Sequence, residues 1–81
     1  MARITRTRMN QEADYFANVA APRSDAGAAD GERVAADPTR SDYTRACAAT
    51  AAKTARSNAA EYRAIADELR AGEIPEGLDL T

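Results

Sequence analysis

Between Pro38 and Gly72 the chain runs for 33 residues without a glycine or a proline. These two residues are the strongest breakers of regular structure, so their absence allows one helix through the whole stretch. Asp37 is a favourable helix N-cap with proline directly after it, and Gly72 followed by Pro75 is typical of a helix end. We therefore predict a long helix over residues 37–71, about 50 Å in length.

Alanine dominates this helix and the whole chain. The 81 residues include 21 alanines but only nine Val, Ile, Leu or Phe, with a net charge of -2. Alanine has the highest helix propensity but a small side chain, so helices should form readily while burying little apolar surface. Such a small domain needs a disulfide, a metal or another chain for support. Cys47 is the single cysteine and histidine is absent, which leaves another chain as the expected support.

The first half of the chain predicts a shorter helix. Residues 1–9 contain three arginines and no acidic residue, and they indicate a basic arm or a short strand. Asn10 is a suitable N-cap, after which apolar residues recur at helical spacing until Pro22. Because proline interrupts helical hydrogen bonding, we predict that this helix covers residues 10–21 and stops there.

Two irregular segments complete the predicted organisation of a single small domain. Residues 22–36 contain Gly27 and Gly31 and favour a turn-rich connector. Residues 72–81 form an acidic tail that is expected to fold back through three apolar side chains, Ile74, Leu78 and Leu80. The predicted fold class is all-α, with a short N-terminal helix, a turn-rich connector and one long Ala-rich helix. Together they would form a helical hairpin that completes its core against another chain.

The long helix carries a heptad seam, a stripe of small and apolar residues separated alternately by four and three positions. Three arginines follow one edge of the stripe, where their stems can cover the joint and their guanidinium groups can bind carboxylates. The seam consists of Ala48, Ala52, Ala55, Ala59, Tyr62, Ala66 and Leu69, and its arginine edge of Arg56, Arg63 and Arg70.

Two interpretations of this seam stay open. It is either an ordinary stripe that faces the core of the chain, or a docking face for a helix of another chain. A first helix of about 12 residues covers only ~18 Å of a ~50 Å partner, which favours docking. The partner would be a second copy of the chain or a larger foreign complex.

Catalytic and membrane functions find little support in the sequence. Acid–base chemistry would fall to carboxylates on an arginine-rich helix, and Cys47 has no neighbouring base of the usual kind. We expect no enzymatic activity, no cofactor or metal, and no small-molecule substrate. The sequence contains no signal peptide, lipidation motif or long apolar run, so the expected location is the cytoplasm or an assembly formed there.

Nucleic-acid binding is the alternative function. Arg3, Arg6 and Arg8 can follow phosphates as a basic arm. The pI near 5.0 argues against it, as does the long helix, which balances six basic residues with five acidic ones. The preferred hypothesis is therefore a non-catalytic interaction or assembly protein. The Ala, Arg and Asp bias suits a genome of high GC content, and small chains of this kind are common in phages and mobile elements, which suggests a virion part or an inhibitor of a host complex.

Overall fold

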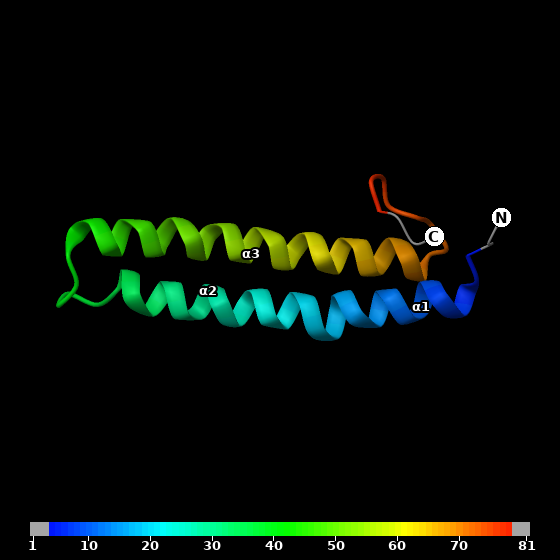
Figure 1. Ribbon diagram of the computed structural model, residues 1–81, viewed down its shortest axis with the longest axis horizontal. Coiled ribbons are helices and arrows are strands. Elements are labelled where there is room, and N and C mark those ends of the chain that lie inside the picture. Colours follow the sequence, from blue (N-terminus) through cyan, green and yellow to red (C-terminus); the bar gives the residue numbers. More distant parts are fainter. Residues whose placement is uncertain (1–3, 79–81) are drawn as a thin grey trace.

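The computed structural model describes residues 4–78, and these form a two-helix hairpin without a β-strand (Figure 1). The first arm is a continuous helical rod of three segments. These are α1 (Arg6–Tyr15), the π-helix η1 (Phe16–Ala20) and α2 (Ala21–Ala35). The second arm is the 29-residue helix α3 (Asp42–Arg70). The prediction of an all-α hairpin is confirmed.

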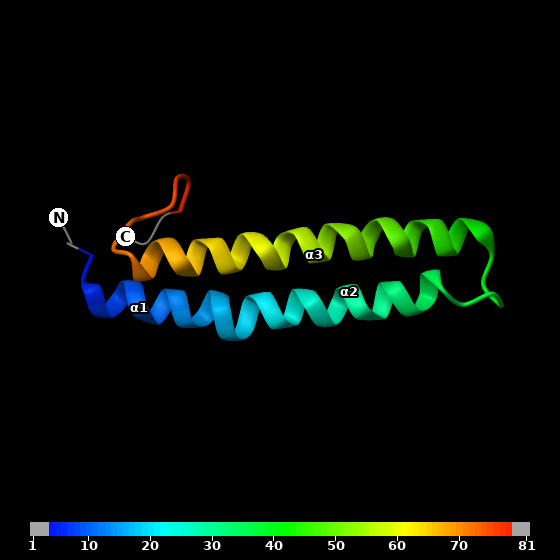
Figure 2. The same cartoon turned by 180° about the vertical axis from the view of Figure 1, so that it is seen from behind.

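The two arms lie side by side along almost their whole length, as two opposite views show (Figures 1 and 2). The molecule measures 55 × 20 × 16 Å along its principal axes. The start of α1 and the end of α3 meet at one end, which we call the open end. The loop between α2 and α3 closes the other end, which we call the loop end.

The first arm is longer than the sequence predicts, because Pro22 does not end it. The π-helix directly precedes this proline, and the amide of Ala21 donates to the carbonyl of Phe16, five residues back. Such a widened turn accommodates a proline ring and tolerates its missing N–H group. The predictions of a helix that stops at residue 21 and of an irregular connector over residues 22–36 are therefore wrong.

The helices also begin at other residues than predicted. The Thr5 hydroxyl accepts from the amide of Arg8 at 3.1 Å and caps α1. The Ser41 hydroxyl accepts from the amide of Thr44 at 3.1 Å and caps α3. Both are typical N-caps. The predicted cap Asn10 lies inside α1, so the predicted arm or strand over residues 1–9 is helical from Arg6 onward.

The second predicted cap, Asp37, organises the loop instead. Its carboxylate accepts from the amide of Thr39 at 2.9 Å and from the Thr39 hydroxyl at 2.7 Å. Its carbonyl accepts from the amide of Arg40 at 3.2 Å, which closes a four-residue turn. Pro38 occupies the second position of this turn, where its fixed φ is favourable. The turn uses residues 37–40, so α3 begins at Asp42.

The predicted end of the long helix is confirmed. Gly72 has a φ of +87° and its amide donates to the carbonyl of Leu69, while the amide of Glu73 donates to the carbonyl of Glu68. This pair of bonds is the Schellman motif, for which glycine is favoured because of its positive φ. The tail then returns toward the helices, and Leu78 packs on the core. Ile74 is half-exposed, and Leu80 lies outside the described residues.

Large apolar side chains gather at the open end. Met9, Ala13, Ala66 and Leu69 form a buried cluster there. The partly buried side chains around it are Ile4, Phe16, Ala17, Ile65 and Leu78. Away from this cluster, the buried apolar residues between the arms are all alanines: Ala21, Ala28, Ala52 and Ala59.

Candidate interaction surface

The heptad seam of α3 faces the first arm of the same chain. Four of its members are buried: Ala52, Ala59, Ala66 and Leu69. Ala48, Ala55 and Tyr62 are half-buried. The seam therefore packs within the hairpin, because the helical residues 22–35 extend the first arm along it. Docking of another chain on these residues stays a prediction that requires the two arms to separate.

The two arms lie very close together at Gly31 of α2. A Cβ atom at this position would lie 3.0 Å from the carbonyl oxygen of Ala48 and 3.1 Å from the Cβ of Ala52. Both distances are shorter than ordinary van der Waals contact. Gly31, which in the sequence indicates a turn, thus permits two helices to pack closely.

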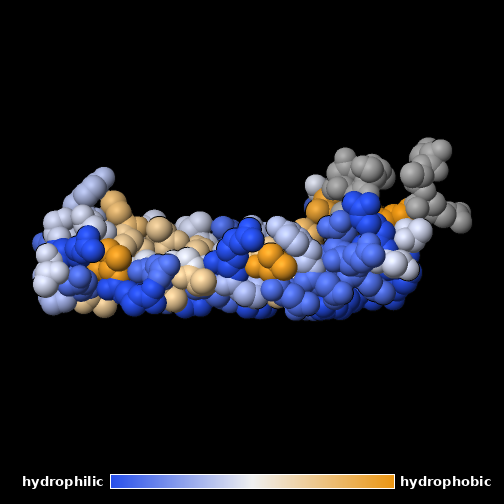
Figure 3. All heavy atoms as spheres, turned by 60° about the horizontal axis from the view of Figure 1, so that its bottom comes forward, coloured by the Kyte–Doolittle hydropathy of each residue, from blue (hydrophilic) through white to orange (hydrophobic). Residues whose placement is uncertain are grey.

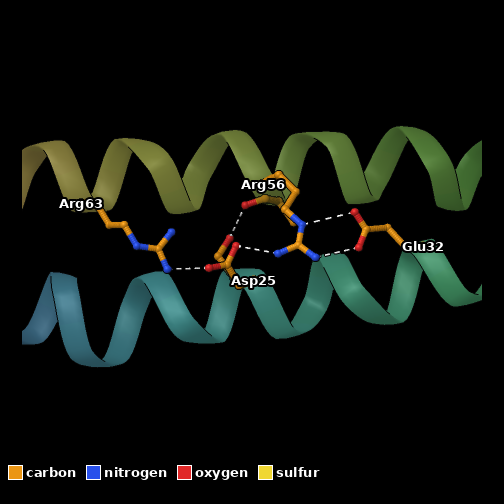
Figure 4. A network of polar contacts seen from close by, with 6 residues as sticks. Asp25, Glu32, Arg56 and Arg63 are labelled. Atoms are coloured by element: carbon orange, nitrogen blue, oxygen red, sulfur yellow. Dashed lines mark hydrogen bonds and ion pairs between the residues drawn. The ribbon is translucent and has the colours of Figure 1, made fainter.

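The arginine edge of the seam also binds the first arm (Figure 4). Arg56 forms a two-pronged contact with Glu32, at 2.7 and 3.2 Å, and donates to Asp25 at 3.0 Å. Arg63 donates to the other carboxylate oxygen of Asp25 at 2.5 Å. Near the open end, Arg70 donates to Asp14 at 3.0 Å. All three predicted edge arginines are therefore engaged within the chain.

These contacts shift the ionisation of the acidic partners. The hydrogen bond from Arg63, assisted by Arg56, holds the pKa of Asp25 below its ordinary value of 3.8. The hydrogen bond from Arg56 holds the pKa of Glu32 below 4.5. Hydrogen bonds and nearby cations favour the ionised carboxylate, so both groups carry their charge at neutral pH. The network thus fixes the register of the arms by complementary charge.

Two further arginines cap helix ends across the hairpin. Arg6 donates to the carbonyl of Arg70 at the last turn of α3, at 2.9 Å. Arg45 donates to the carbonyl of Ala35 at the end of α2, also at 2.9 Å. The last carbonyl groups of a helix lack partners within it and attract cations. These arginines therefore join the arms at both ends of the molecule.

The predicted nucleic-acid arm is partly used by the hairpin itself. Arg6 caps α3, and Arg8 pairs with Glu12 one turn along α1 at 2.9 Å. Arg3 lies outside the described residues. The two of these arginines that the structure describes, Arg6 and Arg8, are thus engaged within the hairpin.

Several large apolar side chains remain on the outside of the hairpin. Tyr43 is 80% exposed, Ile74 49%, Tyr15 47% and Val19 38%. On the face shown in Figure 3, apolar atoms appear as separate spots within a mostly hydrophilic surface. The exposed side chains therefore define local patches rather than one continuous apolar band.

One patch surrounds the π-helix, and we call its four side chains, Tyr15, Val19, Arg23 and Tyr62, the bulge patch. A shallow hollow at this point is lined by Tyr15, Ala20, Arg23, Ser24 and Tyr62. Phe16 supports it from below, because its ring stacks on Tyr62 with centroids 5.9 Å apart and meets Tyr15 edge-on at 5.7 Å. Within residues 4–78 no carboxylate pairs with Arg23.

A second patch lies on α3 near the loop, on the side away from the seam. It contains only uncharged side chains, all of them exposed. Five of them line a shallow and mostly apolar hollow. We call this patch the outer face of α3, formed by Tyr43, Ala46, Cys47, Thr50, Ala51 and Thr54.

Sequence reasoning missed both patches. Tyr15 and Val19 lie in or beside the predicted apolar stripe of the first helix, and no local signal in the sequence marks the π-helix at this point. The outer face of α3 did have a signal in the sequence. From Tyr43 onward, uncharged residues recur at the spacing of one helix face, on the side opposite the seam. Cys47, the single cysteine of the chain, is exposed on that face.

Neither a cluster of metal-ligating side chains nor a membrane-crossing helix is present among the described residues. Residues 4–78 contain no group of three or more Cys, Asp or Glu arranged to hold a metal ion. Nor does any helix in this range have the length and hydropathy needed to cross a membrane.

The comparisons with known proteins identify no relative. No family model, no curated protein and no solved structure matches the chain.

Proposed function

We propose that the protein is a non-catalytic protein–protein interaction or assembly module that acts through the outside of its hairpin. The observation that supports this most is the placement of its few large apolar side chains. Tyr43, Tyr15 and Val19 are substantially exposed, whereas much of the interface between the arms is alanine. Exposed aromatic and aliphatic side chains on a domain with a small core are a common feature of binding surfaces.

In this proposal the seam and its arginine edge have an architectural role. They hold the hairpin closed in one register, and the binding surfaces are the bulge patch and the outer face of α3. The sequence predicts that the seam and its arginine edge contact the partner directly. In this hairpin, such contact would first require the two arms to separate. A rigid rod with two outward patches instead suits a protein that joins or blocks larger components.

The chemistry of the bulge patch indicates the kind of partner it fits. Tyr15 and Tyr62 offer aromatic surface, and Arg23 offers a cation with no carboxylate partner in the described part of the chain. An apolar side chain beside an acidic one on a partner protein complements this arrangement. A structural component of a virus particle and an inhibitor of a host complex are two settings in which such a module would act.

The nucleic-acid alternative gains no specific support from these contacts. Arg6 and Arg8 already bind groups of the hairpin, and the whole chain has a net charge of -2. We therefore propose a protein as the partner.

Affinity capture from the cells that naturally produce the chain tests this function. The tagged wild type is compared with a triple variant of the bulge patch, Tyr15→Ala, Val19→Ala and Arg23→Glu. A matched control changes Gln11→Ala and Asn18→Ala, two exposed residues on the same arm. We expect a retained protein whose amount falls at least about tenfold in the patch variant and stays unchanged in the control.

Light scattering of the purified chain over a range of concentrations completes the test. A chain that stays monomeric and retains no protein in a patch-dependent manner would contradict the proposed function.

A further inference from the structure

The outer face of α3 differs from the rest of the surface in its lack of charge. Charged residues make up 30% of the chain, yet the residues on this face from Tyr43 to Thr54 carry none. They are spaced at three and four positions, so they share one side of the helix over about three turns. The opposite side of α3 is the seam, which the first arm already covers. This face is therefore the free side of the helix.

The shape of the outer face is complementary to itself. Tyr43 is its one large side chain and is 80% exposed at the loop end of the helix. The remaining members are alanine, cysteine and threonine, whose small size leaves the hollow next to Tyr43. If a second copy lies in the opposite direction, each Tyr43 covers the small residues of the other copy. A twofold axis produces this arrangement at both ends simultaneously.

Charges beside this face select the direction of such a pairing. Asp42 and Lys53 are eleven residues apart, which is close to three full turns, so they lie on the same edge of α3. Both are exposed, and neither forms an ion pair within residues 4–78. When two copies run antiparallel, matching edges meet, and Asp42 of each copy faces Lys53 of the other. In a parallel pairing this edge would lie on opposite sides of the interface in the two copies, so Asp42 and Lys53 could not pair.

We propose that two copies of the chain pair antiparallel through the outer faces of α3, with two Asp42–Lys53 contacts across the interface. This proposal rests on the proposed interaction function and names a second copy as the partner for this face. Cys47 lies midway between Asp42 and Lys53, so the two Cys47 thiols come close to the twofold axis. The contact covers about three helical turns, which makes it a reversible dimer rather than an obligate one.

Charge reversal in the full-length chain tests the pairing. Sedimentation equilibrium measures the dimer dissociation constant of the wild type, of Asp42→Lys, of Lys53→Asp and of the variant with both changes. Each single reversal places two pairs of like charges across the interface, so we expect dimerisation to weaken at least about tenfold. The double variant restores opposite charges and is expected to return to within about threefold of the wild type.

Two controls separate pairing from folding. Asp42→Lys also places a cation in the first turn of α3, where it opposes the helix dipole. Lys53→Asp does not, and circular dichroism of both variants reports their helix content. Glu68→Lys reverses an exposed charge near the other end of α3 and is expected to leave dimerisation unchanged. Single reversals with wild-type affinity, or a double variant no better than either single one, would overturn the proposal.

Oxidative cross-linking of Cys47 provides a second and independent measurement. The proposal predicts a covalent dimer at protein concentrations where the non-covalent dimer forms, with less product in Lys53→Asp and recovery in the double variant. A chain that stays monomeric at millimolar concentration refutes the pairing. If that monomer still retains a protein that the bulge-patch variant releases, the proposed function stands while this inference fails.

Discussion

The two ends of the hairpin are held together by different means. At the open end, Met9 and Leu69 are buried under a layer of other large apolar side chains. Toward the loop end, the buried apolar contacts are alanines, and Gly31 permits a close approach of the two arms. Arg56 and Arg63 then connect the arms on the surface. The open end combines such polar contacts with a large buried apolar area, whereas the loop half relies on close backbone packing and charge alone.

This difference indicates where the molecule is least stable. Hydrophobic stabilisation follows the apolar area removed from water, and alanine contributes little of it. Exposed ion pairs contribute little more. The half of the hairpin near the loop should therefore unfold locally before the half that contains the buried cluster. The outer face of α3 lies on this same half, so a second copy would add buried surface where the chain itself supplies least.

The largest expected effect comes from removing Leu69, the one large side chain that is fully buried among residues 4–78. Leu69→Ala should lower the free energy of unfolding by about 2–5 kcal/mol, because it deletes buried methyl groups and leaves a cavity. That is a large part of the stability of a small domain. The control Ile74→Ala truncates a half-exposed residue nearby and should change stability by less than about 0.5 kcal/mol. Urea denaturation measures both, and equal effects would contradict the assignment of the core.

A pair of glycine variants tests the close packing of the loop half. Gly31→Ala places a methyl group against Ala48 and Ala52, so the arms must move apart. We expect a net loss of about 1 kcal/mol, even though alanine favours the helix. Gly27→Ala, in the same helix, meets nothing within 4 Å and should stabilise the protein by about 0.5–1 kcal/mol. Thermal unfolding of both variants checks the pair, and a gain in stability at both positions would show that the arms are not in close contact.

The smallest expected effect is the pH dependence of the charge network. The pKa values of Asp25 and Glu32 are lower in the folded chain than their ordinary values of 3.8 and 4.5. Their stabilising contribution is therefore present above these values and is lost as the pH falls through and below them. We expect the thermal midpoint to decrease modestly between pH 6 and pH 3. The decrease should be smaller in the double variant Arg56→Gln, Arg63→Gln, and identical pH profiles would exclude the network as its cause.

Much of the second arm was predictable, because its signals are local. An uninterrupted run of good helix formers and the Gly72 cap defined α3 to within five residues at its start and one at its end. The spacing alone identified the residues of the seam, but it left open whether they face the core of the chain or another chain. At the start of α3 the prediction was displaced, because Asp37 and Pro38 form a turn whose sequence pattern resembles a helix start. The N-cap of α3 is Ser41.

The first arm was not predictable from local signals, because the roles of its proline and of Gly31 depend on the surrounding tertiary structure. A proline inside a helical pattern usually ends the helix. Here the π-helix that precedes Pro22 accommodates the proline ring and its missing N–H group. Gly31 suggests a turn, yet it is needed where two helices come too close for a Cβ atom. The docking interpretation of the seam rested on a first arm of about 12 residues. An arm that extends from Arg6 to Ala35 covers the seam itself.

The most direct test of the account asks whether the seam is closed within one chain. Glu32→Cys and Arg56→Cys are introduced together with Cys47→Ser, and the thiols are joined by a short bismaleimide. Isotopically heavy and light chains are refolded together before the reaction, and the linked peptides are then analysed by mass spectrometry. The account predicts linked pairs that are entirely heavy or entirely light. Pairs that combine one heavy and one light peptide in statistical proportion would show that the seam joins different chains, and would contradict it.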